Sequence, residues 1–281
     1  MKTKHILIPT DFSENAWNAI VYAINLYGKE ACNFFILHVS AENEYEVYNN
    51  VPLTQQSSAT KVASKPSQLL LQNTIKRIQE NFGKNLLHRF VTISDSDSLI
   101  KAIRQQVLLN KIDVIVMGTK GVSGCTERTV GTNAGNVITK VNCTTLVVPE
   151  NAKFVTPKKI AFPTDFSIFY NVNTLQPLAD IIKKNHAEIE FLHISKRDLV
   201  LNENQRINIE YLEDYFSENS HSFHFLTHTK IEHAIQDFVN DKGVTLITML
   251  GKNLNYFQHI LFHPLAKEIS YYKDVPFLVL H

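Results

Sequence analysis

The stretch Val114–Val141, VIVMGTKGVSGCTERTVGTNAGNVITKV, determines how the rest of the chain is interpreted. Its opening run VIVM is apolar and predicts a buried parallel strand. A polar loop containing Gly118 and Gly121 follows, and Gly131 and Thr132 begin a segment whose apolar residues have helical spacing. A strand, a glycine-containing loop and a helix N-terminus together favour anions, because backbone N–H groups and the helix dipole attract negative charge. The stretch therefore predicts a phosphate-binding loop.

Outward from this stretch, the sequence repeats itself in two halves. The segment PTDFS occurs at Pro9–Ser13 and again at Pro163–Ser167. Further paired segments follow in the same order: Leu37–Ser40 with Leu192–Ser195, Val114–Gly118 with Ile247–Gly251, and Leu146–Val148 with Leu278–Leu280. Repeated landmarks in one order indicate a tandem duplication. We expect two domains, residues 1–150 and 151–281, joined near residues 150–157.

Each half alternates short apolar strands with amphipathic helices. In the first half the expected strands are residues 6–8, 34–39, 89–93, 114–117 and 145–148. One helix is expected from about Ser13 to a cap at Gly28, and another is expected to be capped by Asp95 or Ser96. This alternation predicts an α/β fold with a parallel sheet covered on both faces.

The second half follows the same course, with its third strand expected near residues 224–227. The segments 41–65 and 196–206 are polar and predict excursions from the regular alternation, the first of them long.

The composition of the chain argues against several classes of protein. The formal net charge is +1 without a basic stripe, which argues against nucleic acid as a partner. The three cysteines, Cys32, Cys125 and Cys143, have no paired spacing and indicate a reducing compartment. Apolar runs stay short of the roughly 18–20 residues of a membrane span. Met1 leads almost directly into a strand, so we expect no signal peptide and a cytoplasmic protein.

The spacing of Gly118, Gly121, Gly131 and Thr132 is G-x2-G-x9-G-T, which is neither the Rossmann fingerprint nor a P-loop. It resembles the phosphate-binding signature of the ATP-binding branch of the universal stress protein family, and the resemblance covers both halves of the chain. The resemblance implies two tandem Rossmann-like or flavodoxin-like domains, each a five-stranded parallel sheet of order 3-2-1-4-5. Domains of that family associate through their last strands. Thr145–Val148 and Phe277–Leu280 could therefore form a pseudo-dimer within one chain, and a further homodimer stays open.

The same resemblance implies one ATP, or another adenine nucleotide, bound in the first domain with or without Mg²⁺. The nucleotide would lie outside the carboxyl ends of the strands, where ligands of open α/β sheets bind. The resemblance assigns it these residues: Pro9, Thr10, Asp11, Val39, Met117, Gly118, Lys120, Gly121, Arg128, Gly131, Thr132 and Asn133. Within the loop, Glu127 would either repel the γ-phosphate or help to hold Mg²⁺.

Some of these residues have a plainer interpretation as well. Asp11 would contact the ribose or base, or it would cap the following helix. Val39 would contact adenine through its main chain, and its side chain is typical of a strand end in the core. His38 and His193 share the frame LH[V/I]S and favour a structural role, since the sequence places no Ser or Cys partner beside them.

The second half departs from the glycine pattern. After Gly251, Leu254 stands in the place of Gly121, and the pair at 263–264 is His-Pro instead of Gly-Thr. A bulky apolar loop would keep phosphates away from the backbone. We therefore expect no nucleotide in the second domain.

Histidine is concentrated in the second half, which holds 9 of the 12. A zinc site would need ligands with paired spacing, and neither a helical HxxxH pair nor a cysteine partner is present there. The sequence therefore assigns no metal ligand.

These observations predict a stress-response switch or sensor whose nucleotide changes its binding to an unidentified protein partner. No general base is evident, so we assign no catalytic residue and expect any ATP hydrolysis to be slow. The alternative is a nucleotide-free scaffold or chaperone-like interaction protein. Its contact surfaces would be residues 41–65 and 254–262.

Overall fold

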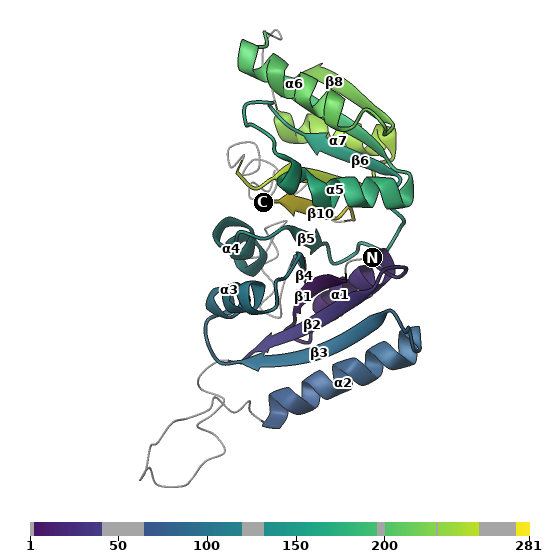
Figure 1. Ribbon diagram of the computed structural model, residues 1–281, viewed down its shortest axis with the longest axis vertical. Helices are drawn as coiled ribbons and strands as arrows, with labels where there is room; N and C mark the ends of the chain where they lie inside the picture. The colour runs from purple at the N-terminus through teal and green to yellow at the C-terminus, as the bar shows by residue number, and fades with distance from the viewer. Residues whose placement is uncertain (1–2, 41–64, 120–131, 196–199, 229, 253–273) are drawn as a thin grey trace.

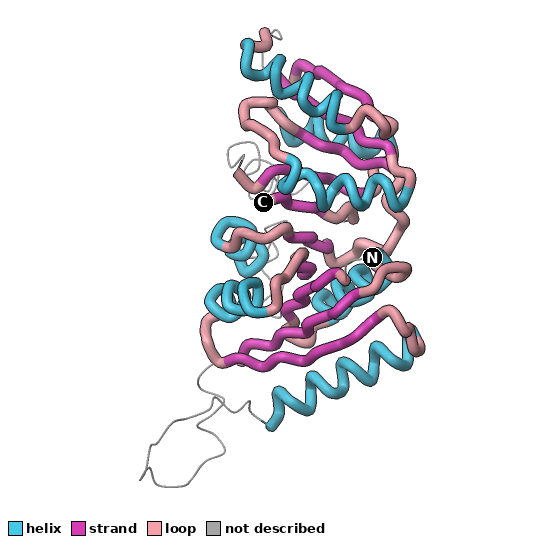
Figure 2. The backbone as a smooth tube through the Cα atoms, in the orientation of Figure 1, coloured by secondary structure: helices cyan, strands magenta, loops and turns pink. Residues whose placement is uncertain are grey.

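The computed structural model describes residues 3–40, 65–119, 132–195, 200–228, 230–252 and 274–281. These residues form one twisted sheet with helices on both faces (Figure 1), and strands alternate with helices along each half (Figure 2). The first half contains β1 (Lys4–Pro9), α1 (Glu14–Leu26), β2 (Cys32–Val39), α2 (Lys65–Phe82), β3 (His88–Asp95), α3 (Leu99–Leu109), β4 (Val114–Gly118), α4 (Thr132–Lys140) and β5 (Thr145–Val148). The second half contains β6 (Lys159–Pro163), α5 (Val172–Asn185), β7 (Glu188–Ser195), α6 (Glu203–Tyr215), β8 (His221–Thr227), α7 (Ile231–Lys242), β9 (Leu246–Leu250) and β10 (Phe277–Leu280).

The strand order is β3-β2-β1-β4-β5-β10-β9-β6-β7-β8. Within each half the neighbouring strands are parallel, so the predicted order 3-2-1-4-5 is confirmed twice. The last strands of the halves pair antiparallel, with Leu146 of β5 opposite Leu278 of β10. This is the pairing that the sequence predicts. It gives both strands a partner and joins the halves into a single sheet.

Two apolar clusters cover the two faces of the sheet. Because side chains alternate along a strand, Ile6 and Ile8 belong to the cluster under α1, α2, α5 and α6, whereas Leu7 belongs to the cluster under α3, α4 and α7. Each cluster contains residues from both halves. Burying apolar surface stabilises by about 25 cal/mol per Å². The packing therefore stabilises the two halves together as well as each half alone.

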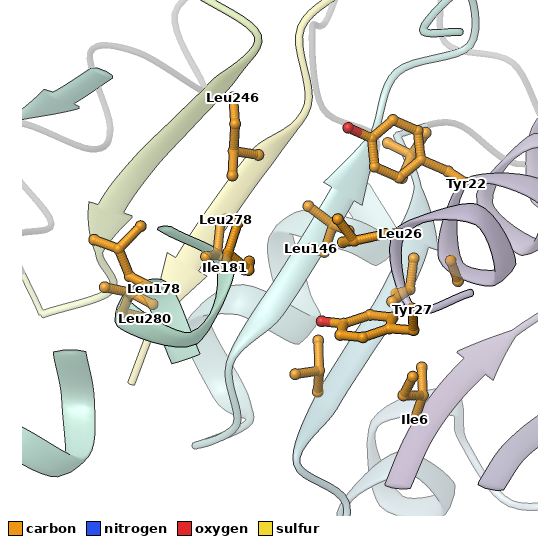
Figure 3. Packing of buried hydrophobic residues seen from close by; sticks show 14 of the residues in the cluster. Ile6, Tyr22, Leu26, Tyr27, Leu146, Leu178, Ile181, Leu246, Leu278 and Leu280 are labelled. Carbon is orange, nitrogen blue, oxygen red and sulfur yellow. The ribbon is translucent and has the colours of Figure 1, made fainter. Parts of the chain in front are cut away.

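The junction between the halves illustrates this shared packing. Figure 3 shows Leu146 of β5 next to Leu278 of β10, with Ile181 of α5 on one side and, on the other, Leu26 at the end of α1 and its cap Tyr27. All five side chains are buried. The antiparallel pairing is thus supported by a core that two helices from different halves complete.

Some expected helix ends are displaced. Helix α1 starts close to the expected position, with Ser13 as its N-cap through a hydrogen bond from the Ala16 backbone N–H, but Gly28 lies one residue beyond the cap at Tyr27. The expectation that Asp95 or Ser96 caps α3 is wrong. Asp95 is the last residue of β3, paired with Val39, and the cap of α3 is Ser98. The pairing of β3 with β2 continues to Asp95, beyond the residues 89–93 that the sequence predicts as a strand.

The second half also has more regular structure than its sequence indicates. Helix α6 begins at Glu203, within the segment expected to be an excursion, because Asn202 and Gln205 form a capping box. Strand β8 begins at His221, three residues before the expected start. Residues 41–64 of the longer excursion lie outside the described residues.

In the part of the chain that the structure describes, no helix combines the length and the apolar character needed to cross a membrane.

Candidate functional site

The candidate site lies at the carboxyl ends of β1 and β4. The ladder between these strands joins Ile6 with Val114 and Leu7 with Ile115, and it stops short of the ends of both strands. The chain leaves β1 for α1 on one face of the sheet and leaves β4 toward α4 on the other face. This is the point at which the strand order reverses, where open α/β sheets bind their ligands.

The turn after β1 is held by its own side chains. Thr10 Oγ1 accepts a hydrogen bond from the Phe12 N–H at 3.0 Å, and Asp11 Oδ1 accepts from Ser13 N–H at 3.1 Å and Ser13 Oγ at 2.6 Å. Phe12 has a φ of 65°, in the left-handed region that bulky residues rarely adopt. The local hydrogen bonds therefore hold a strained turn.

One of the two interpretations of Asp11 is wrong. Ser13, not Asp11, is the N-cap of α1. Asp11 accepts hydrogen bonds from Ser13 and so positions the residue that caps the helix. The half-buried carboxylate stands directly after the end of β1.

Gly118, the last residue of β4, lies against the first turn of α1. A Cβ atom added to Gly118 would come within 2.9 Å of Cγ and Oδ1 of Asn15. Real Cβ atoms do not come that close, so the backbone approaches α1 only because residue 118 is glycine. This contact brings the end of β4 to the helix turn that follows PTDFS.

Asn15 is a site neighbour that sequence reasoning missed. It is buried in the first turn of α1. A polar residue on the buried side of an amphipathic helix is unusual, and this signal could have identified it.

The other predicted residues of the strand ends lie where expected. The side chains of Pro9, Thr10 and Met117 are buried, and Val39 is half-buried at the end of β2. Met117 and Val39 belong to the cluster on the α4 face. The Met117 side chain therefore fills the core, whereas the Val39 side chain is only partly covered.

The phosphate loop itself is largely outside the described residues. Lys120, Gly121, Arg128 and Gly131 fall in the range 120–131. Helix α4 begins at Thr132, as the spacing predicts. The next residue, Asn133, is exposed.

His38 has the structural role that the sequence favours. Its Nδ1 lies 2.9 Å from the carbonyl oxygen of Thr10, and its ring lies 4.4 Å from that of Phe12. His193 repeats both contacts, with Thr164 at 3.1 Å and Phe166 at 5.6 Å. Burial lowers the pKa of His193 and outweighs its hydrogen bond to Thr164.

The equivalent turn of the second half is present but covered. Asp165 Oδ1 accepts from Ser167 just as Asp11 accepts from Ser13. Here, however, the carbonyl oxygens of Asp165 and Phe166 accept hydrogen bonds from Gln205 Nε2 at 2.6 Å and Asn208 Nδ2 at 2.7 Å. The N-terminal part of α6 therefore lies over this turn.

Two further differences separate the turns. Thr164 Oγ1 lies 2.7 Å from Tyr170 Oη, and both groups are buried. Phe166 is fully buried, whereas Phe12 is half-buried. At the same distance from its helix end as Asn208, α2 carries Ile75, whose side chain cannot donate a hydrogen bond. The two halves thus share a turn and differ in what covers it.

A possible metal centre was tested separately. Among the described residues, no group of three or more histidine, cysteine, aspartate and glutamate side chains is arranged to hold a metal ion.

Comparisons with known proteins agree with the architecture. The model of the universal stress protein family matches residues 2–149. A universal stress protein from Methanocaldococcus jannaschii is 25% identical over 159 residues, which cover 53% of this chain and 84% of the relative.

Solved structures cover the whole length. The crystal structure of a universal stress protein from Archaeoglobus fulgidus covers 99% of this chain and 98% of its own, with a TM-score of 0.59 and 13% identity. A protein of unknown function from Pseudomonas aeruginosa covers 99% of this chain and 92% of its own, with a TM-score of 0.60 and 12% identity. These two structures show that the fold of both halves is a known one. With the family model matching more than half of its residues, the chain belongs to the universal stress protein family.

Proposed function

We propose that the first half, residues 1–150, is a domain that binds ATP or another adenine nucleotide at the carboxyl ends of β1 and β4. The bound nucleotide sets the affinity of the chain for a protein partner, so that the protein acts in the cytoplasm as a switch or sensor in the stress response. Residues 151–281 form a second domain, which pairs with the first as an intramolecular pseudo-dimer.

The observation that carries the proposal is the contact between Gly118 and Asn15. It places the first glycine of the G-x2-G-x9-G-T spacing beside the turn that contains Thr10 and Asp11. The predicted site has three parts: the turn after β1, the end of β4 and the start of α4 at Thr132. All three border the point where the strand order reverses.

Roles follow from the chemistry of each part. The half-buried Asp11 accepts hydrogen bonds from ribose or base, and the main chain of Pro9, Thr10, Val39 and Met117 lines the base. Phosphates approach the backbone where Gly118, Gly121 and Gly131 lack side chains. Thr132 and Asn133 then offer N–H groups at the start of α4, and Lys120 and Arg128 add positive charge.

For the second half we propose that no nucleotide binds. Two carbonyl oxygens of its turn are already hydrogen-bonded to α6, and Phe166 is fully buried. A nucleotide there would have to displace buried contacts.

A titration tests the proposal, because the chain has a single tryptophan, in the helix that follows the turn after β1. Trp17 lies in the first turn of α1, with the Arg77 guanidinium 4.0 Å from its ring. We expect Trp17 fluorescence to change on addition of ATP and to saturate at one equivalent per chain. Gly131→Glu places a carboxylate among the phosphates and should abolish the change.

The matched control is Lys252→Glu, which adds a carboxylate at an exposed position next to the corresponding strand end of the second half. It should leave the ATP titration unchanged. Two equivalents of ATP in the wild type would contradict the proposal for the second half. Absence of binding, checked by equilibrium dialysis with and without Mg²⁺, would favour the nucleotide-free scaffold instead.

A further inference from the structure

A cavity of about 160 Å³ lies at the amino end of the sheet in the first half, opposite to the candidate nucleotide site. It is bordered by the C-terminal ends of α1 and α2 and by the start of β3, which can be followed in Figure 1. It opens to solvent on the side of the exposed Gly83. The described residues that line it are Ile24, Asn25, Gly28, Ile78, Phe82, Gly83, Asn85, His88 and Phe90.

The two halves differ at the helix end that borders the cavity. In both halves the helix before the third strand ends at an equal distance from that strand, α2 at Phe82 and α6 at Tyr215. The next residue donates its N–H to the carbonyl four residues earlier, Gly83 at 2.9 Å and Phe216 at 3.0 Å. The two positions correspond along the chain, but Gly83 has a φ of 67° and Phe216 a φ of −102°, so they differ in backbone conformation as well as in side chain.

In the second half the aromatic side chain fills the space. Phe216 is fully buried, with its ring 5.8 Å from that of Phe191, which stacks on Phe223 at 4.8 Å. In the first half the same kind of stack, Phe34 on Phe90 at 5.1 Å, borders the cavity.

In the first half the corresponding residue is Gly83, which carries no side chain and is exposed. A Cβ atom added to Gly83 would meet no atom within 4 Å. The size of the cavity suits one six-membered ring. An engineered cavity of roughly 150 Å³ is known to bind benzene, which is the same scale.

The lining also restricts the chemistry of a ligand. Among the described residues that line the cavity there is no lysine, arginine, aspartate or glutamate. A charged ligand would lose part of its hydration without gaining an ionised partner among these residues, so the lining favours a neutral ligand. The walls are aliphatic and aromatic: Ile24, Ile78, Phe82 and Phe90.

His88 supplies the polar contact. Its Nε2 lies 3.3 Å from both Asn85 Nδ2 and the Tyr27 carbonyl oxygen, and Nδ1 has no hydrogen-bond partner among the described residues. Burial lowers the pKa of His88 and outweighs its bond to Tyr27, so the ring is neutral near pH 7. A hydroxyl group suits Nδ1 in either tautomer, because it can donate to a bare nitrogen or accept from an N–H.

We propose that this cavity binds a neutral single-ring aromatic molecule that carries a hydroxyl group, with the ring against Phe82 and Phe90 and the hydroxyl on His88. The site is separate from the proposed nucleotide site and does not depend on it.

The test uses phenol as the probe and the full chain labelled with ¹⁵N. We expect saturable shifts of the backbone resonances of Gly83, Asn85 and His88, at one phenol per chain. Ile78→Phe should fill the cavity and weaken the binding of phenol at least tenfold. The melting temperature of this variant should be unchanged or higher. Leu70→Phe adds a ring on the exposed side of the same helix and should bind phenol like the wild type.

A second variant tests the hydrogen bond. His88→Leu keeps the cavity apolar but removes the polar partner, so phenol should bind no better than toluene does. Phenol binding unchanged in His88→Leu would overturn the assigned ligand class. Shifts that do not saturate, or Ile78→Phe binding phenol as tightly as Leu70→Phe, would overturn the site itself.

Discussion

Gly118 at the end of β4 touches the side chain of Asn15 in α1 so closely that a Cβ atom would overlap it, at 2.9 Å. Asn15 is buried, so its short side chain has little room to move. We expect Gly118→Ala to push α1 away from β4 and to lower both the melting temperature and the affinity for ATP, the latter at least tenfold.

Melting curves and Trp17 fluorescence titrations measure the two effects. Gly28→Ala is a suitable control, because its Cβ atom would lie 3.3 Å from helix carbonyls far from the site. If Gly118→Ala bound ATP like the wild type, the contact would have no part in nucleotide binding.

The hydrogen bonds from α6 to the turn after β6 can be tested through Asn208. Its Nδ2 donates to the buried carbonyl oxygen of Phe166 at 2.7 Å. Asn208→Ala leaves this acceptor without its partner, which typically costs about 1–3 kcal/mol of unfolding free energy. Urea unfolding measures the loss. Ile207→Ala, at an exposed neighbouring position, should change stability by less than about 0.5 kcal/mol.

The repeats made the sheet predictable from the sequence. Identical PTDFS segments fixed two copies of one turn, and the apolar runs fixed the strands between them. The structure reproduces this in the paired contacts of Asp11 with Ser13 and of Asp165 with Ser167. Such local patterns can be recognised in the sequence because they are formed by residues that are close together in the chain.

The differences between the halves were less predictable, since they depend on contacts between distant residues. Nothing near Phe166 in the sequence indicates that Asn208 would donate to its carbonyl oxygen. The cavity beside the end of α2 combines residues of α1, α2 and β3 that lie far apart in the sequence, such as Ile24 and Phe90. The N-cap of α3, Ser98, was missed for a similar reason. The ladder between β2 and β3 extends the strand to Asp95, so the helix begins later than the sequence indicates.

A buried carboxylate in the second half predicts a pH dependence. Glu190 of β7 accepts from Ser222 Oγ at 2.6 Å and contacts His224 Nε2, and Lys242 Nζ lies 3.9 Å away. Burial alone would raise the pKa of Glu190, but the hydrogen bonds of Ser222 and His224 and the charges of His224 and Lys242 together lower it.

A lowered pKa in the folded state means that the ionised carboxylate stabilises the fold. This contribution is complete above the unfolded pKa, about 4.3, and is lost as the pH falls through the folded pKa. We expect Glu190→Gln to cost about 1–3 kcal/mol near neutral pH, and the difference from the wild type to shrink as the solution is acidified below that value. Urea unfolding across this range measures it. Glu218→Gln, at an exposed site, should show a difference that is small at every pH.

The last prediction concerns the ion pairs that link the halves. Lys4 Nζ of β1 lies 2.9 Å from Asp180 Oδ2 of α5, and Lys184 of α5 lies 2.7 Å from Glu30. Both ammonium groups lie close to the ring of the buried Tyr27, at 5.5 and 5.6 Å from its centre. Burial would lower the pKa of Lys4, but Asp180 and Glu30 outweigh it and raise the pKa.

Because Asp180 is partly exposed, water and salt screen the pair, and we expect a coupling of about 0.5–1 kcal/mol from a double-mutant cycle of Lys4→Ala and Asp180→Ala. The coupling should fall when salt is added, since the Debye length shortens to about 3 Å near 1 M. The exposed pair Lys76–Glu80 on α2 is the reference and should give a weaker coupling. A Lys4–Asp180 coupling no larger than that reference would mean that this ion pair adds no measurable stability to the β5–β10 pairing and the apolar packing that join the halves.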